Sequence, residues 1–192
     1  MGVVIPGSMF TKGRLLVATP PLDDPNFDRT VIFMLEHHDE GAIGVVINHP
    51  TDESLDESLD RWEELQASPG AVFRGGPVDT GALIALAFAK APITTTSDEL
   101  SPVSGYVASA DLTTDPALVA AVVNSVRVFR GYAGWGPGQL DGEIGAGAWL
   151  VLDSEPQDVF AAAPDNLWRT VLRRQGGRLA WLAEAPDDLA TN

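Results

Sequence analysis

Short apolar runs separated by proline- and glycine-containing turns dominate the first third of the chain. Residues 15–18 form an apolar run that ends at Thr19-Pro20-Pro21, which is typical of a buried strand. Residues 30–37 and 42–48 are rich in β-branched side chains, and only the turn Asp39-Glu40-Gly41 separates them. Two apolar runs joined by so short a turn predict an antiparallel hairpin.

The middle of the chain mixes helical and strand patterns. Leu55, Leu59 and Trp62 recur at helical spacing among acidic residues, which predicts a surface helix with an acidic outer face at residues 55–67. The remainder of this region is predicted to form two short strands and a loop, at 71–74, 83–88 and 91–104.

Two helix-start signals mark the second half of the chain. Asp115 can cap a helix whose first turn contains Pro116, with a buried stripe formed by Leu118, Val119, Val122 and Val123. Asp165 is predicted to cap a last helix that ends at Gly176-Gly177, with a buried face of Leu167, Trp168, Val171 and Leu172. Strands are predicted at 126–129 and 149–152.

Strands and helices therefore alternate irregularly, which favours an α+β fold over a regular doubly wound sheet. A chain of 192 residues with 45% hydrophobic residues fits one domain with a sizeable core. We assign this domain to residues 13–178, a flexible N-terminal segment to 1–12 and a C-terminal tail to 179–192.

The composition excludes several classes of chemistry. The chain has no cysteine, so disulfides, thiolate nucleophiles and iron–sulfur clusters cannot form. No window reaches the apolar length of a membrane-spanning helix, and no basic residue precedes Lys12 as a signal peptide would require. We therefore expect a soluble cytoplasmic protein without membrane contact.

The net charge of −15 bears on the choice of partner. A nucleic acid would meet long-range repulsion, whereas nucleic-acid-binding proteins gain affinity by neutralising phosphates. The arginines near the last predicted helix are explained by its dipole and by pairing with acids on a solvated face. The charge thus disfavours direct nucleic-acid binding and leaves a small ligand or a protein as partner.

The glycine-rich segment 131–138 is the most informative stretch of the chain. Glycines that precede a helix can expose backbone N–H groups to a phosphate, but Pro137 stands where a phosphate-binding loop has lysine. The alternative is a tight turn from strand to helix with Tyr132 and Trp135 packed beneath it. We expect Trp135 to be partly exposed, and Trp181, beyond the last helix, to anchor the tail or a partner.

Several polar residues form candidate sites. Gln139 and Glu143 lie four apart on a predicted helix and share a face, and Glu36 and His37 end the first strand of the hairpin. Together with Arg29 and Asn48 they could build an acid–base site or a polar network that fixes loop geometry. No catalytic serine elbow or zinc-binding helix motif is present. Glu36, His38 and His49 do not justify a metal site, and we predict neither metal nor cofactor.

An ordered set of motifs gives the chain a resemblance to a known family. These are Gly13-Arg14-Leu15-Leu16-Val17-Ala18-Thr19-Pro20, Asp24-Pro25-Asn26-Phe27 with Arg29-Thr30-Val31, Glu36-His37, Gly41-Ala42-Ile43-Gly44, Asn48-His49-Pro50, Gly75-Gly76-Pro77-Val78 and Gly131-Tyr132-Ala133-Gly134-Trp135 with Pro137-Gly138-Gln139-Leu140 and Glu143-Ile144. In this order they resemble the bacterial YqgE/AlgH family. The resemblance implies a single α+β domain with mixed, partly barrel-like sheets flanked by helices.

The resemblance does not supply an activity. The family has no agreed enzymatic reaction, and some members have been described as candidate transcriptional regulators, notably of alginate synthesis. His49 departs from the family pattern, which has arginine between the asparagine and the proline. If that arginine binds an anion, His49 would do so only when protonated.

Three functional hypotheses follow. The preferred one is a non-enzymatic domain that binds a ligand or a protein partner, with an indirect route for any regulatory role. Its candidate binding residues are Arg29, Asn48, Gly75, Gly76, Tyr132, Trp135 and Gln139. The alternative is an enzyme that transfers protons with Glu36, His37 and Glu143, and it requires these groups to converge. The least favoured hypothesis is a transcriptional regulator that contacts DNA directly.

Overall fold

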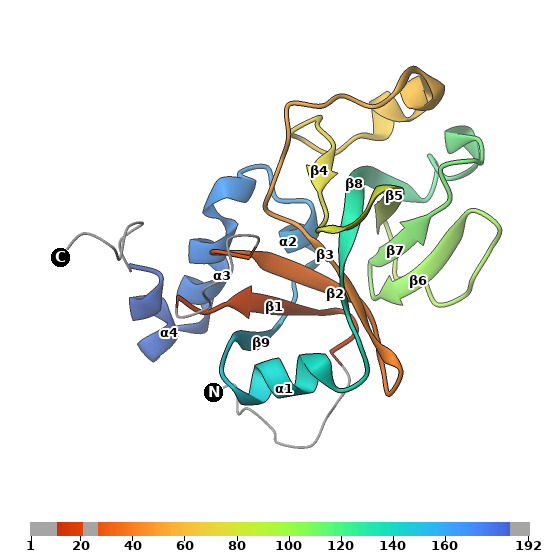
Figure 1. The fold of residues 1–192 in the computed structure, drawn as a ribbon. Helices are drawn as coiled ribbons and strands as arrows, with labels where there is room; N and C mark the ends of the chain where they lie inside the picture. The colour runs from red at the N-terminus through yellow and green to blue at the C-terminus, as the bar shows by residue number, and fades with distance from the viewer. Residues whose placement is uncertain (1–10, 21–26, 185–192) are drawn as a thin grey trace.

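The computed structural model describes residues 11–20 and 27–184, which form a strongly curled sheet with helices on its faces (Figure 1). The strands are β1 (Arg14–Ala18), β2 (Val31–His38), β3 (Gly41–Val46), β4 (Phe73–Arg74), β5 (Val78–Ala89), β6 (Leu100–Ser104), β7 (Val107–Ala110), β8 (Val123–Trp135) and β9 (Trp149–Asp153). The helices are η1 (Glu57–Leu65), η2 (Pro116–Leu118), α1 (Gln139–Gly145), α2 (Pro156–Val159), η3 (Pro164–Asn166), α3 (Leu167–Gln175) and α4 (Gly177–Leu182), where η marks a 3₁₀ helix.

The strands form one nine-stranded sheet in the order β6-β7-β5-β8-β3-β2-β1-β9, and β4 pairs with β8 beside this path. The pairs along the path are antiparallel, and β4 runs parallel to β8. The sheet curls into a half-barrel, which confirms the predicted α+β fold with mixed, partly barrel-like sheets.

The long strand β8 joins two wings of this sheet. Its first part pairs with β5, and its last three residues pair with β3. One wing therefore contains β5, β6 and β7, and the other contains β1, β2, β3 and β9. The predicted hairpin is confirmed as β2–β3, which contains a β-bulge between Met34 and Glu36.

The short strand β4 enters the sheet where β3 and β8 diverge. The Gly75 N–H donates to the Arg130 carbonyl at 2.8 Å, and the Gly75 carbonyl accepts from the Val46 N–H at 2.8 Å. Gly75 thus bridges the two wings through its own backbone. This close approach requires glycine, because a Cβ on Gly75 would overlap the Gly131 carbonyl and a Cβ on Gly76 would overlap the Tyr132 carbonyl.

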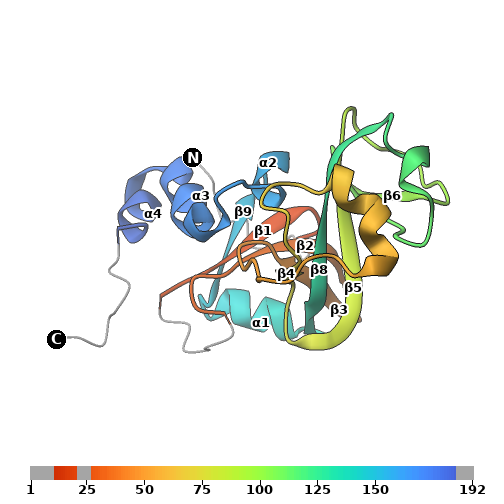
Figure 2. The ribbon, with the colours of Figure 1, turned by 90° about the horizontal axis from the view of Figure 1, so that it is seen from above.

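Helices cover both faces of the β1–β3 wing (Figure 2). On one face, α1 packs Leu140 into a cluster with Leu16, Ile32 and Trp149. On the opposite face, α3 contributes Trp168 to the largest cluster, which also contains Phe33. Because alternate residues of a strand point to opposite faces, β1 and β2 can supply both clusters.

The other wing is covered by η1, which buries Leu59 and Trp62 against β5 and β8. The prediction of a helix with an acidic outer face is confirmed in outline, but its turns are those of a 3₁₀ helix. Leu59, Trp62 and Leu65 recur every three residues, which suits three residues per turn.

Arg127 of β8 is a buried cation between the segment that follows η1 and the C-terminal end of α2. Only 1% of its surface is exposed, and its guanidinium donates to the carbonyls of Ser68, Val159 and Ala161. It also lies over the Phe73 ring, with 4.2 Å between Cζ and the ring centroid. Burial lowers the pKa of Arg127 to about 10. Neutral acceptors and an aromatic face therefore replace water around this charge.

Several predicted element boundaries were wrong. β8 continues to Trp135 through most of the glycine-rich segment, and residues 100–104, predicted as loop, form β6. η2 is a single turn that leaves Leu118 and Val122 exposed, and Asp165 lies inside η3 with no capping bond to α3. α3 ends before Gly176, as predicted, but it is not the last helix, because α4 follows from Gly177.

The described residues contain no helix long and apolar enough to cross a membrane. Thr11 and Lys12 of the predicted N-terminal segment are described, whereas residues 1–10 and 185–192 lie outside the described residues.

The crossing at Gly76 yields a stability prediction. Gly76→Ala should lower the free energy of unfolding by about 3 kcal/mol or more, because the Cβ collides with β8 and φ is +154°. Gly142→Ala is the matched control, since a Cβ there meets open space on α1, and it should raise stability by about 0.5–1 kcal/mol. Urea denaturation measures both changes, and a wild-type midpoint for Gly76→Ala would contradict the tight crossing.

Candidate functional site

Glu143 of α1 holds two buried indole rings together. Its Oε2 accepts hydrogen bonds from Trp135 Nε1 at 2.9 Å and from Trp149 Nε1 at 2.8 Å. The two rings meet edge to face, with their centroids 6.1 Å apart. Oε1 of Glu143 accepts from Gln139 Nε2 at 3.0 Å. The carboxylate is thus engaged on both oxygens and fixes α1 to the sheet.

The same network closes the turn between β8 and α1. Gln139 Oε1 accepts from the Gly136 N–H at 3.0 Å, and Gly138 precedes the helix in the left-handed region at φ +69°. Trp135 is only 8% exposed, so the expectation that it is partly exposed was wrong. α1 and the Glu143 network cover its ring. Tyr132 lies half-buried against the cluster on the opposite face.

The acid–base candidates of β2 lie on opposite faces of the strand. Glu36 pairs with Ile43 and His37 with Ala42, so their side chains diverge. Glu36 contacts Lys12 and His38 at the exposed surface. His37 is 4% exposed; its Nδ1 lies 3.2 Å from Thr11 Oγ1, and its Nε2 lies 3.8 Å from Asp141 Oδ1.

The structure therefore does not gather Glu36, His37 and Glu143 into one acid–base site. Glu36 and His37 face apart, Glu143 binds two indoles, and Arg29 lies beyond the other end of β2. Gly75 and Gly76 contact the β8 backbone rather than a hollow. Within the described ranges, no group of three or more histidine, aspartate or glutamate side chains is arranged to hold a metal ion.

Arg29 and Asn48 do meet, at the open end of the β2–β3 hairpin. Asn48 Oδ1 accepts from the Val31 N–H at 2.9 Å, and its Nδ2 donates to the Arg29 carbonyl at 3.0 Å. Asn48 thereby holds the residue before β2 in place. Arg29 adopts the left-handed conformation at φ +49°, which non-glycine residues seldom adopt.

These two residues line a cleft of about 250 Å³, which we call the mixed-charge cleft; its lining is Asp28, Arg29, Asn48, His49, Asp165, Trp168 and Arg169. The Arg29 guanidinium stacks over the Trp168 ring, with 5.2 Å between Cζ and the centroid. Trp168 donates from Nε1 to the Ala18 carbonyl at 2.9 Å, which fixes the indole. The cleft thus combines two cations, two carboxylates and an aromatic surface held by the core.

Burial lowers the pKa of His49 below its usual value, and the nearby Arg74 lowers it further. The carboxylates of Asp165 and Asp28 oppose this shift to a smaller extent. His49 is therefore neutral near pH 7, and its protonation on acidification would add a positive charge to the cleft.

Sequence reasoning missed the part of the cleft that η3 and α3 supply. Trp168 was predicted only as a core residue, and Asp165 and Arg169 only as helix-end charges. They are more than 110 positions from Asn48 in the sequence, so no local pattern could bring them to it. The Trp168 indole has two roles, since it packs in the core and carries the Arg29 cation.

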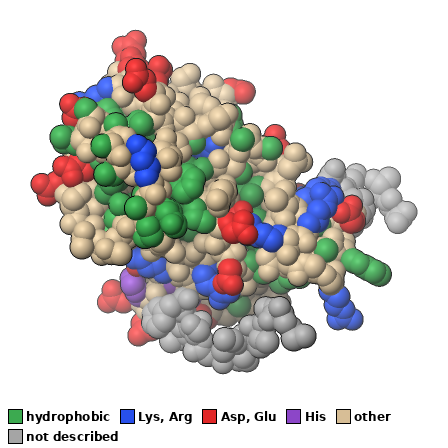
Figure 3. Space-filling model, turned by 180° about the vertical axis from the view of Figure 1, so that it is seen from behind, with side chains coloured by type: hydrophobic (Ala, Val, Ile, Leu, Met, Phe, Trp, Pro, Cys, Tyr) green, Lys and Arg blue, Asp and Glu red, His purple; other side chains and the backbone are tan. Residues whose placement is uncertain are grey.

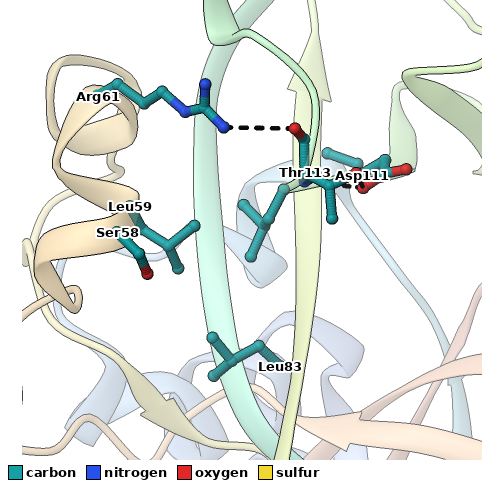
Figure 4. Close-up of a pocket in the computed structure, with 8 residues that line it drawn as sticks. Ser58, Leu59, Arg61, Leu83, Asp111 and Thr113 are labelled. Atoms are coloured by element: carbon teal, nitrogen blue, oxygen red, sulfur yellow. Dashed lines mark hydrogen bonds between the residues drawn. The ribbon is translucent and has the colours of Figure 1, made fainter.

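A second hollow lies at the other wing, between η1 and the segment after β7 (Figure 4). This apolar groove has a volume of about 570 Å³ and is lined by Ser58, Leu59, Arg61, Leu83, Ala110, Asp111, Leu112 and Thr113. Arg61 spans it at one end, where its guanidinium donates to the Thr113 carbonyl at 3.3 Å. Hydrogen bonds from Thr113 lower the pKa of the Asp111 carboxyl, so this side chain stays charged.

The chain is similar in sequence to a known protein family. A family model described as AlgH-like matches residues 15–180. A UPF0301 protein of Streptomyces avermitilis is 47% identical over 182 residues, and one of Thermobifida fusca is 44% identical over 187 residues; each match covers 94% of both chains.

Two solved structures are also similar. The crystal structure of protein DIP2367 from Corynebacterium diphtheriae has a TM-score of 0.82 and 28% identity, and covers 91% of this chain and 92% of that one. The solution structure of the AlgH protein from Pseudomonas aeruginosa has a TM-score of 0.66 and 28% identity, and covers 98% of this chain and 100% of that one.

The Glu143 network yields a second stability prediction. Glu143→Ala leaves two buried indole N–H groups without their acceptor, and should lower the free energy of unfolding by about 2–5 kcal/mol. Glu143→Gln retains one oxygen and should cost less. Thermal unfolding and near-ultraviolet circular dichroism measure the loss, with exposed Glu63→Ala as a near-neutral control. Equal stability of the Glu143→Ala and Glu63→Ala variants would contradict the assignment.

The cleft histidine yields a pH prediction. Because the pKa of His49 is lower in the folded chain than the unperturbed 6.5, the unfolded state binds more protons below pH 6.5, and stability falls with acidification. The melting temperature of the His49→Gln variant should therefore fall less between pH 7 and pH 5 than that of the wild type. Ser54→Gln, at an exposed position without a titratable side chain, should retain the wild-type slope. If His49→Gln also retains it, the assignment is wrong.

Proposed function

The chain belongs to the AlgH-like family, as its motifs predicted, and we propose that it is a ligand-binding domain whose ligand is a small molecule bearing a carboxylate or phosphate group. The binding site in this proposal is the mixed-charge cleft. The enzyme hypothesis receives no support from the placement of its residues, because Glu36, His37 and Glu143 do not converge.

One observation carries the proposal. Three residues of two segments on which the family resemblance rests, Arg29, Asn48 and His49, meet at the cleft, whereas Val31 of the same segments packs in the core. Another conspicuous segment, 131–138, forms the end of β8 and the turn that connects it to α1. The cleft therefore gathers polar side chains of these two segments together with those that η3 and α3 bring to it.

The chemistry of the cleft defines the ligand class. A guanidinium carries its N–H donors in a plane whose geometry matches a carboxylate or phosphate, and stacking on Trp168 orients that plane for Arg29. Arg169 adds a second cation, whereas Asp28 and Asp165 balance the local charge. This balance, within a chain of net charge −15, favours a singly charged or zwitterionic ligand over a polyanion.

The proposal includes a cytoplasmic location and, for any regulatory role, an indirect route. A ligand bound at the cleft would act through a protein partner, because the overall charge opposes contact with a nucleic acid. Direct transcriptional control is therefore not part of the proposal.

Ligand binding can be tested by thermal shift with glutamate, acetate and inorganic phosphate as probes. At least one probe should raise the melting temperature, since occupancy at 100 times Kd stabilises a protein by about 2.7 kcal/mol. Arg29→Gly should abolish the shift while the free energy of unfolding stays within about 1 kcal/mol, because glycine relieves the left-handed strain as the stacking is lost.

Arg61→Gln is the matched control, since this arginine lies at the apolar groove of the other wing and should keep the full shift. An unchanged shift in Arg29→Gly would place the binding elsewhere. No shift with any probe in the wild type would reject the proposed ligand class.

A further inference from the structure

The α4 end of the molecule presents an exposed tryptophan. Trp181 has 83% of its surface exposed, whereas the neighbouring Leu179, Leu182 and Ala183 pack against the main core. The helix is therefore docked, and the indole points away from it into solvent. Removing an aromatic side chain of this size from water is favourable, so the position suits contact with another molecule.

A basic residue accompanies this indole. Arg178 lies three residues before Trp181 on α4, so both side chains share a face of the helix. Within the described part of the chain, Arg178 has no carboxylate partner, whereas Arg173 is paired with Glu184 and Arg174 with Asp158. Figure 3 shows hydrophobic and basic side chains projecting side by side from the α4 end.

The apolar groove has the complementary properties. Its floor contains Leu59, Leu83 and Leu112, and its volume of about 570 Å³ exceeds what one indole fills. Arg61 and Asp111 balance each other in its lining, and η1, which borders it, also carries the exposed carboxylates of Glu57, Asp60, Glu63 and Glu64, for which the described residues provide no ion-pair partner. The elements that line the groove, η1 and the segment after β7, lie at the opposite end of the molecule from α4 in Figure 1, so the two surfaces cannot meet within one chain.

We propose that the apolar groove binds α4 of a second copy of this chain. Trp181 of one copy occupies the groove between Leu59 and Leu83, and Arg178 faces the carboxylates of η1. Hydrophobic burial supplies the attraction, and the charge pairing fixes the orientation. The inference uses no residue of the mixed-charge cleft and is independent of ligand binding there.

This contact runs head to tail, because the inserting helix α4 and the elements that form the receiving groove lie at opposite ends of the molecule. Each added copy then offers a further α4 and a further groove, so association proceeds beyond a dimer to chains or rings. One indole and its neighbours bury less than a standard interface, which makes the contact weak. The net charge of −15 on each copy opposes assembly at low ionic strength. At a salt concentration of about 0.15 M the Debye length is about 8 Å, so the repulsion between the copies is largely screened.

Sedimentation velocity over about 10–500 μM, at 0.15 M salt, tests the proposal. The wild type should show concentration-dependent growth beyond a dimer. Trp181→Ala removes the inserting side chain, and Ser58→Arg places a cation and a long side chain in the groove at an exposed position. Either change should weaken association at least about 30-fold, as expected for a central aromatic contact. Ile43→Ala and Ser54→Arg, at exposed positions outside the groove and α4, should associate like the wild type.

A mixing experiment separates this contact from other modes of association. The Trp181→Ala variant retains an intact groove, and the Ser58→Arg variant retains an intact α4. Each should stay monomeric alone, and an equimolar mixture should form a one-to-one complex that grows no further. A monomeric wild type, variants that associate like the wild type, or a mixture without the one-to-one complex would each overturn the proposal.

Discussion

The close crossing of β4 over β8 is the constraint on which the rest of the structure depends. Gly75 donates to one wing of the sheet and accepts from the other, and Gly76 passes directly over the Tyr132 backbone. Only residues without a Cβ allow this separation. The crossing ties β3 to β8 through the Gly75 backbone, at the place where the two wings of the half-barrel meet. Both the mixed-charge cleft and the apolar groove lie outside this junction, on the elements that it positions.

The residues most conspicuous in the sequence turned out to be architectural. The glycine and tryptophan pattern of 131–138 gave the strongest signal for recognising the family, and the structure uses it to close β8 onto α1 through Glu143. Arg127 shows the opposite case, because nothing in its neighbourhood marks it as a buried cation. Its acceptors are backbone carbonyls of the segment after η1 and of the end of α2, which the sequence pattern leaves undefined. The unusual composition of segment 131–138 thus reflects close packing of the backbone and not a binding or catalytic site.

The elements that were predictable are those that a local pattern determines. The β2–β3 hairpin follows from two apolar runs around Asp39-Glu40-Gly41, and the burial of Leu59 and Trp62 follows from their spacing. The exposure of Trp135 was not predictable, since it depends on α1 folding back over the strand. Half of the mixed-charge cleft was predictable, because the sequence analysis names Arg29 and Asn48 as candidate binding residues. The other half comes from α3, which tertiary packing alone brings to the hairpin.

The place of β8 in the chain has a consequence for biosynthesis. The ribosome completes β1–β3 and β5–β7 before it adds residues 123–135, the strand that pairs with both groups. Until then, β3 and β5 each present an unpaired edge, and unpaired edges recruit other strands. The nascent chain therefore carries two open edges from the synthesis of β5 until the synthesis of β8. The many carboxylates in the first two thirds of the chain repel other copies electrostatically, which disfavours edge-to-edge association of nascent chains before β8 pairs with β3 and β5.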